Sequence, residues 1–242
     1  MRRGWLVAIL GIFLAAAPSA GAASKPLVIG TEPNFPPLSY LEGSRIAGFE
    51  IDLIQELAKG MGTTVHLQNV SFGDQPKLLA AGKLDAAISS WTITPERAKT
   101  LAFSDAYFDA GQAIVVTKAS KLRTRHELKG RVVGVQLGTT GEEAAKNQLD
   151  SQGVKPYPDI AQAFDELDGG RIGAVVVDLP VALNELKQRK DLKIIGGTLT
   201  AERYGIVAAP RQRALIQRFN EQLAKMKADG RYSKLYTKWF GL

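Results

Sequence analysis

A run of hydroxyl side chains and one arginine follows a short apolar segment in the first half of the chain. After the mostly apolar segment 84–88 the sequence reads Ser89-Ser90-Trp91-Thr92-Ile93-Thr94-Pro95-Glu96-Arg97. An arginine guanidinium is a planar fork of donors that matches a carboxylate, and hydroxyls can hold the other polar atoms of a small zwitterion. Thr94-Pro95-Glu96 also suits the cap and first turn of a helix, but capping leaves both serines, Thr92 and Arg97 unexplained. We therefore expect an anion clamp at a strand end, beside a helix that begins at Pro95.

Two more polar segments follow predicted strands in the second half. Gly138-Thr139-Thr140-Gly141-Glu142 joins a strand to a helix, where backbone N–H groups and the positive end of the helix dipole attract an anion. Asp178 ends the apolar strand 173–177, where a carboxylate is costly unless it is paired, for example with a ligand ammonium group. Helix N-capping is the alternative for both segments. Together with Arg97, the pattern favours an α-carboxylate held between Arg97 and the helix that opens at Thr140.

Aromatic residues lie close to these strand ends. Glu32 and Phe35 occupy the loop after the first predicted strand, and Phe72 and Trp91 likewise follow strands. Such aromatics could form the walls of an apolar slot, although aromatic side chains are more often part of a core. We consider Phe35 and Phe72 better candidates for such a wall than Trp91.

Short β-rich runs alternate with helical ones from Leu27 onward, which predicts an α/β protein with parallel strands. The expected strands are 27–30, 65–70, 84–89, 131–136, 154–157, 173–177 and 192–195, and the expected helices are 50–59, 75–81, 140–149, 160–167 and 180–189. Two such series in tandem predict two Rossmann-like α/β lobes.

The apolar runs 113–116 and 204–208 flank the second series, so we expect them to be two crossover strands that join the lobes. The helices after Arg211 would then return to the first lobe. This organisation predicts one lobe from residues 24–112 with 203–242 and a second from 113–202. A cleft between the lobes would collect the polar strand ends described above, because ligands of α/β sheets bind beyond the carboxyl ends of the strands.

The N-terminus reads as a cleavable secretory signal covering residues 1–23. Met-Arg-Arg precedes an apolar stretch from Trp5 to Ala17, and small residues surround a cleavage point after Ala22 or Ala23. A membrane anchor would need about 20 apolar residues, and this stretch stops short of that at Pro18. Because the sequence contains no cysteine, neither a lipid-modified cysteine nor a disulfide is expected. The simplest expectation is a free periplasmic protein held together by its core.

Composition and motifs disfavour several other functions. The net charge of +7 could suit a nucleic acid, but no zinc-finger, RNA-recognition or helix-turn-helix signature organises the basic residues. Catalysis finds little support, because there is no cysteine and no Gly-x-Ser-x-Gly elbow, and the two histidines lie in a predicted strand (His66) and before a turn that links the domains (His126). We expect no metal and no cofactor.

From about Pro26 to Leu242 the chain resembles the family 3 solute-binding proteins, the polar amino-acid binding proteins of bacterial ABC importers. The segments that carry the resemblance are Ile29-Gly30-Thr31-Glu32-Pro33-Asn34-Phe35-Pro36-Pro37, Gly48-Phe49-Glu50-Ile51-Asp52-Leu53, Ala81-Gly82-Lys83-Leu84-Asp85-Ala86-Ala87, Thr92 to Arg97, Phe103-Ser104-Asp105-Ala106-Tyr107-Phe108, Val133-Gly134-Val135-Gln136-Leu137-Gly138-Thr139-Thr140, and the strand end at Asp178. The resemblance implies the type II periplasmic binding protein fold.

The resemblance also implies roles for the polar residues. Arg97 and the Thr140 amide would hold the ligand α-carboxylate, and Asp178, Thr92 and the Ser90 carbonyl would hold the α-ammonium group. The pocket for the ligand side chain would be lined by Glu32, Phe35, Phe72, Ser89, Trp91 and Gln136.

An acid at Glu32 flanked by aromatic rings resembles the pocket of family members that bind arginine, lysine or ornithine, because such a pocket offers a cation both π-faces and a carboxylate. We therefore expect a basic L-amino acid, arginine first, with glutamine or another polar amino acid as the alternative. We expect a monomeric binding protein that closes about its hinge on the ligand and delivers it to a membrane ABC permease. A cyclohexadienyl-dehydratase-like enzyme on the same fold and a sensory module are the other classes considered.

Overall fold

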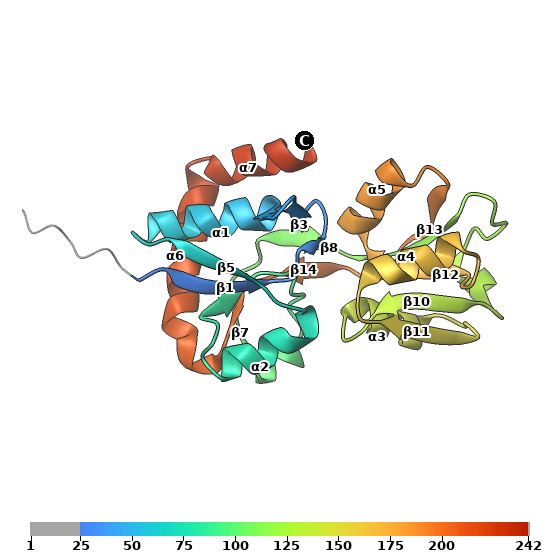
Figure 1. The fold of residues 1–242 in the computed structure, drawn as a ribbon, viewed down its shortest axis with the longest axis horizontal. Coiled ribbons are helices and arrows are strands. Elements are labelled where there is room, and N and C mark those ends of the chain that lie inside the picture. Colours follow the sequence, from blue (N-terminus) through green and yellow to red (C-terminus); the bar gives the residue numbers. More distant parts are fainter. Residues whose placement is uncertain (1–24, 242) are drawn as a thin grey trace, which may run out of the picture.

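The computed structural model of the chain describes residues 25–241. The expected signal segment 1–23 therefore lies outside the described residues. Within them, two five-stranded sheets form the centres of two lobes, which lie side by side along the long axis of the molecule (Figure 1). The expected α/β class with two Rossmann-like lobes is confirmed.

The sheet of the first lobe has the strand order β5-β1-β6-β15-β7. β1 pairs in parallel with β5 and β6, and β15 runs antiparallel between β6 and β7. These strands are β1 Leu27–Thr31, β5 Val65–Asn69, β6 Ala86–Ala87, β7 Ala102–Phe103 and β15 Val207–Ala208. The helices of this lobe are α1 Phe49–Gly60, α2 Gln75–Ala80, α6 Arg213–Ala228 and α7 Arg231–Phe240. A small sheet at one side contains β2 Asn34–Phe35, β3 Ser39–Glu42 and β4 Arg45–Ala47.

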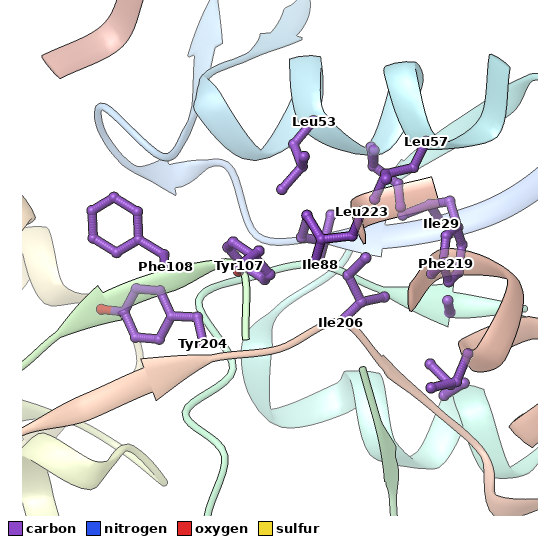
Figure 2. Packing of buried hydrophobic residues seen from close by; sticks show 14 of the residues in the cluster. Ile29, Leu53, Leu57, Ile88, Tyr107, Phe108, Tyr204, Ile206, Phe219 and Leu223 are labelled. Carbon is purple, nitrogen blue, oxygen red and sulfur yellow. The ribbon is translucent and has the colours of Figure 1, made fainter. Parts of the chain in front are cut away.

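Alternating residues of the central strands explain how this lobe packs. Ile29 of β1 joins the cluster beneath α1 and α6, whereas its neighbour Val28 packs on the opposite side with Leu79 of α2. The period of two along a strand requires this division, so each face of the sheet needs its own helix. On α1, Leu53 and Leu57 lie one turn apart on the buried face, and Figure 2 shows them above Ile29 and Ile88.

The sheet of the second lobe has the order β11-β10-β12-β9-β13. Its strands are β9 Gln112–Thr117, β10 Val132–Gln136, β11 Gly153–Tyr157, β12 Ala174–Asp178 and β13 Leu192–Thr198. Its helices are α3 Thr140–Gln148, α4 Ile160–Asp168 and α5 Leu179–Gln188. Every residue of β12 is buried, as its continuous apolar sequence predicts for a strand covered on both faces. The α4 side chains pack on one face of this sheet and Ala145 of α3 on the other.

The connection between the lobes differs from the expected one. The chain crosses on a short antiparallel ribbon, in which β8 Phe108–Ala110 pairs with β14 Glu202–Tyr204. Residues 113–116, expected to be a crossover strand, lie inside β9 within the second sheet, and residues 204–208 divide between β14 and β15. Burial is the reason: the apolar runs are sheet interior, and the segments that cross are only three residues each.

Candidate functional site

A cavity of about 350 Å³, which includes space open to solvent, lies between the lobes. It is lined by Glu32, Asn34, Phe35, Phe72, Ser89, Ser90, Thr92 and Arg97 from the side of the first sheet, and by Gln136, Thr139, Thr140 and Asp178 from that of the second. The structure thus brings together at one cavity every residue proposed from the sequence except Trp91, and it adds Asn34. The strand-end argument explains this, because β1, β6, β10 and β12 all end at the cleft.

Arg97 spans the two lobes. Its Nη1 donates to the carbonyl oxygen of Thr92 at 3.2 Å, and its Nη2 donates to that of Gly138, across the cleft, at 3.0 Å. The guanidinium carbon lies 5.5 Å from the centre of the Phe72 ring and 5.0 Å from that of Trp91, within the range of cation–π attraction. Burial lowers the pKa of Arg97, while the acids Glu143, Glu202 and Asp178 oppose that shift, and an arginine remains protonated throughout the physiological range.

The helix expected from Pro95 is absent, and this expectation was wrong. Residues Arg97–Lys99 form a single 3₁₀ turn, η2. The hydroxyl of Thr94 still accepts a hydrogen bond from the Arg97 N–H at 3.2 Å, so the capping interaction exists without a helix behind it. No longer helix forms because the chain enters strand β7, Ala102–Phe103, only three residues after the 3₁₀ turn.

Trp91 lies behind the cavity wall instead of in it. Only 3% of its surface is exposed, its ring stacks on Phe72 with the ring centres 4.1 Å apart, and its Nε1 donates to Gln75 at 2.7 Å. With its single donor satisfied inside the lobe, the indole supports the Phe72 ring, which itself lines the cavity.

Asp178, at the end of β12, is a buried carboxylate that faces the cavity. Burial raises the pKa of Asp178 to about 6, a hydrogen bond from the Tyr204 hydroxyl lowers it, and the neighbouring charge of Glu202 raises it. Although Asp178 occupies the N-cap position of α5, its side chain makes no capping hydrogen bond. The capping alternative therefore does not account for this residue.

Glu32 and Gln136 meet across the cleft. The Gln136 side-chain nitrogen donates to Glu32 Oε2 at 2.7 Å and to the Pro158 carbonyl at 3.3 Å. Burial raises the pKa of the Glu32 carboxyl, and the hydrogen bonds from Gln136 and the Phe72 backbone lower it. The arrangement shows that Glu32 can accept a donor placed between the lobes.

Thr139 and Thr140 open α3 with different contacts. Thr139 is its N-cap, since its hydroxyl accepts from the Glu142 N–H at 3.2 Å. The Thr140 hydroxyl instead donates to Glu202 at 2.8 Å. Helix capping thus explains Thr139. The hydroxyl of Thr140 instead contacts Glu202, a residue that was not expected from the sequence.

Two buried acids behind the cavity were not expected from the sequence. Glu50 of α1 is fully buried, and its Oε1 accepts from the Ser90 N–H at 2.7 Å, from the Ser90 hydroxyl at 3.0 Å, and from the Tyr107 hydroxyl. Burial raises the pKa of Glu50 to about 7 against these hydrogen bonds. Ser90 has a φ of 52°, a left-handed backbone that is uncommon for a residue other than glycine. Glu50 thus stabilises the turn that ends β6.

The burial of Glu50 could have been predicted from the sequence. It precedes the apolar residues Ile54 and Leu57 by four and seven positions, which places it on the buried face of α1. The burial of Glu202 could not have been predicted in this way, because a strand of three residues is too short to show a hydrophobic periodicity.

Two negative findings concern residues 25–241. In that part of the chain no group of three or more His, Asp or Glu side chains is placed to hold a metal ion. None of its helices is both long and apolar enough to cross a membrane.

The sequence from residue 27 to residue 242 matches the model of the bacterial extracellular solute-binding proteins, family 3. The chain belongs to this family. The arginine-binding extracellular protein ArtP of Bacillus subtilis (strain 168) is 33% identical to this solute-binding protein, over 90% of the chain and 88% of ArtP.

Solved structures agree with the family assignment. An ancestral arginine-binding protein bound to glutamine has a TM-score of 0.85 and 42% identity, covering 90% of this solute-binding protein and 98% of the ancestor. An ancestral amino acid-binding protein, described as a precursor of cyclohexadienyl dehydratase, has a TM-score of 0.83 and 37% identity, covering 89% and 95% of the two chains. The fold is therefore that of type II periplasmic binding proteins.

Proposed function

We propose that this protein captures a basic L-amino acid, arginine first and then lysine or ornithine, and delivers it to a membrane ABC permease. The observation that carries the proposal is the set of charges at the cavity: among its lining residues, Arg97 is a cation, and Glu32 and Asp178 are acids. A basic amino acid has one carboxylate and two cationic groups, so its charges complement these three side chains one by one.

Each ligand group has a partner in this proposal. The α-carboxylate would take the guanidinium of Arg97 and the backbone N–H of Thr140 at the start of α3, where the helix dipole favours an anion. The α-ammonium group would take Asp178, the Thr92 hydroxyl and the Ser90 carbonyl. A guanidinium or ammonium at the far end would reach Glu32 beside the rings of Phe35 and Phe72, near Ser89 and Gln136.

Closure of the lobes would bury the ligand. We assign residues 24–112 with 203–242 to one lobe and 113–202 to the other, with β8 and β14 as the hinge. Periplasmic binding proteins are the usual example of hinge closure around a ligand. The contacts of Arg97 with Gly138 and of Gln136 with Glu32 support this, because both connect the lobes across the cavity. We propose a monomer in the periplasm, released after cleavage of the signal segment, with no nucleic acid as partner.

Glutamine is the second candidate. The Glu32 carboxylate already accepts a hydrogen bond from the side-chain amide of Gln136, so it could equally accept one from a ligand amide, and a structural relative described as an ancestral arginine-binding protein was solved with glutamine bound. We propose binding without catalysis. Because one structural relative is described as a precursor of cyclohexadienyl dehydratase, dehydratase activity is the enzymatic alternative to test.

The test is isothermal titration calorimetry of the mature protein, unfolded and refolded to remove any bound ligand, against L-arginine, L-lysine, L-ornithine and L-glutamine. Tightest binding of one of the three basic amino acids is the expected result. Binding of L-glutamine alone would retain the amino-acid clamp and refute the cation pocket. Turnover of prephenate or arogenate without binding of these amino acids would replace the transport role with an enzymatic one.

A further inference from the structure

Glu202 lies in strand β14, is buried, and is not one of the residues that line the cavity. Its Oε2 accepts from the Thr92 hydroxyl at 2.7 Å and from the Thr140 hydroxyl at 2.8 Å. The Gln112 side-chain nitrogen adds a third, longer contact to this oxygen at 3.4 Å, and the Thr200 hydroxyl donates to Oε1 at 2.8 Å. One carboxylate oxygen therefore collects hydroxyls from both lobes.

The contact with Glu202 determines which way the Thr92 hydroxyl points. A hydroxyl has one hydrogen to donate and two lone pairs with which to accept. An ionised carboxylate can only accept, so the hydrogen of Thr92 must point at Glu202 and away from the cavity. The hydroxyl oxygens of Thr92 and Thr140 are 3.3 Å apart, but both hydrogens are directed at Glu202. Thr92 therefore presents lone pairs to the cavity that it lines.

We propose that Glu202 is a positioning residue for ligand selection: by holding the Thr92 hydrogen, it makes the Thr92 hydroxyl an acceptor toward the ligand α-substituent. An α-ammonium group has three hydrogens and can donate at once to Asp178, Thr92 and the Ser90 carbonyl. An α-hydroxyl group has one hydrogen and meets acceptors at the other positions, which leaves lone pairs facing each other. Glu202 thus favours α-amino acids over α-hydroxy acids. This inference rests on the proposed amino-acid binding.

The experiment measures selectivity as the ratio of two dissociation constants, that of the α-hydroxy analogue of arginine (2-hydroxy-5-guanidinopentanoate) divided by that of L-arginine. Glu202→Met removes the acceptor with little change in side-chain length, so the Thr92 hydroxyl can turn toward the cavity. We expect the ratio to fall by about tenfold or more, the scale set by one hydrogen bond to a charged group.

Glu202→Gln separates hydrogen-bond direction from charge. The amide oxygen can take the place of Oε2 while the NH₂ group faces the Thr200 hydroxyl, so we expect the ratio to stay within about twofold of wild type. Glu221→Met is the matched control, because Glu221 is an exposed acid of α6 that does not line the cavity. It should leave the ratio unchanged.

Thr92 gives a second route if the Glu202→Met protein folds poorly. Thr92→Val removes the acceptor and should lower the ratio, whereas Thr92→Ser keeps the hydroxyl and should restore it. In the Thr92→Val background, a change at Glu202 should have no further effect on the ratio, because the residue through which it acts is gone.

Two results would overturn the inference while the proposed function stands. If Glu202→Met weakens both ligands by the same factor, Glu202 only holds the lobes together. If Glu202→Gln lowers the ratio as far as Glu202→Met, the charge and not the hydroxyl direction is responsible. If wild type binds L-glutamine instead of L-arginine, the same ratio is measured with glutamine and its α-hydroxy analogue. Wild-type protein that binds neither amino acid would overturn both the function and the inference.

Discussion

At the scale of single residues, the cleft contains carboxylates that are costly in the absence of a cation. Burial is the largest cause of the raised pKa of Glu32, Glu50 and Asp178 alike. For Asp178 and Glu32, which line the cavity, a bound cation would remove that cost by pairing with the ionised form. The same buried carboxylates would therefore destabilise the ligand-free protein and strengthen the binding of a cationic ligand.

Asp178→Asn should stabilise the ligand-free protein while it abolishes ligand binding. The folded-state pKa of about 6 lies above the ordinary value of 3.8, so the native state binds protons more tightly than the unfolded state. Wild-type stability from this group therefore falls as pH rises from about 4 to about 7. The amide does not ionise, and its oxygen can still accept from Tyr204.

Urea unfolding at about pH 4 and about pH 7.5 tests this expectation. The free energy of unfolding of Asp178→Asn minus that of wild type should become more positive by about 2–3 kcal/mol at the higher pH. Glu50 titrates in the same window, and because the charge of Asp178 contributes to its raised pKa, the difference also contains a smaller contribution from Glu50. A difference that does not change with pH would refute the assigned shift, and retention of ligand binding would refute the role of Asp178.

Glu32→Gln should change which amino acid is preferred. The variant loses the acceptor charge for a guanidinium, so arginine affinity should fall by about 1.5–3 kcal/mol, roughly tenfold to a hundredfold. Glutamine affinity should change much less. Calorimetry with both ligands checks the expectation, and Glu96→Gln, an exposed acid outside the cavity, is the control. Equal losses for both ligands would show that Glu32 acts only through its contact with Gln136.

Sequence chemistry located the cavity residues well because most of them follow strands in a parallel arrangement, which brings their ends to one edge. It erred on Trp91, whose position after a strand looked the same as that of a cavity residue but whose ring is buried against Phe72. It missed Glu202, because a hinge strand of three residues brings together groups as distant in sequence as Thr92. Such a contact depends on tertiary placement alone.

At the scale of elements, the hydrophobic periodicity of α1 and of the buried strand β12 was sufficient to predict them, whereas the short elements were not predictable. The expected strand 84–89 is reduced to Ala86–Ala87, because the left-handed Ser90 turns the chain out of the sheet. The hinge was expected at the apolar runs 113–116 and 204–208, but the first run lies in β9 of the second sheet, and only Tyr204 of the second run lies in the crossing ribbon. The crossing ribbon is defined by its close contacts, which composition does not reveal.

Gly111→Ala tests the contacts at the hinge. Gly111 follows β8, and a methyl group there would lie 2.3 Å from the backbone oxygen of Thr200. Since backbone cannot move aside as a flexible side chain can, we expect a loss of about 1–3 kcal/mol in unfolding free energy and weaker arginine binding. Gly153→Ala in β11 is the control, because its added methyl group meets no atom within 4 Å. Thermal unfolding and calorimetry are the measurements, and unchanged stability of Gly111→Ala would contradict the tight crossing.

At the scale of the whole molecule, the lobes touch through groups that also line the cavity. Arg97 reaches Gly138, Gln136 reaches Glu32, and the hydroxyls of Thr92 and Thr140 share Glu202. A ligand that engages both lobes would favour the arrangement in which these contacts are made, since it binds that arrangement better than one with the lobes apart. Under the proposed hinge closure, ligand affinity and the arrangement of the lobes would therefore be linked.

Small-angle X-ray scattering can measure that link. We expect L-arginine to reduce the radius of gyration of the wild-type protein, because closure brings the two lobes together. Arg97→Ala should remain at the ligand-free value at an arginine concentration that saturates wild type, since truncating one partner of a buried charge pair costs about 2–5 kcal/mol or more. Arg97→Lys keeps the charge without the planar fork and should respond only at higher arginine concentrations. If Arg97→Ala closes at the same arginine concentration as wild type, the ligand carboxylate does not bind at Arg97, and the coupling of the lobes must arise from the other groups that cross the cleft.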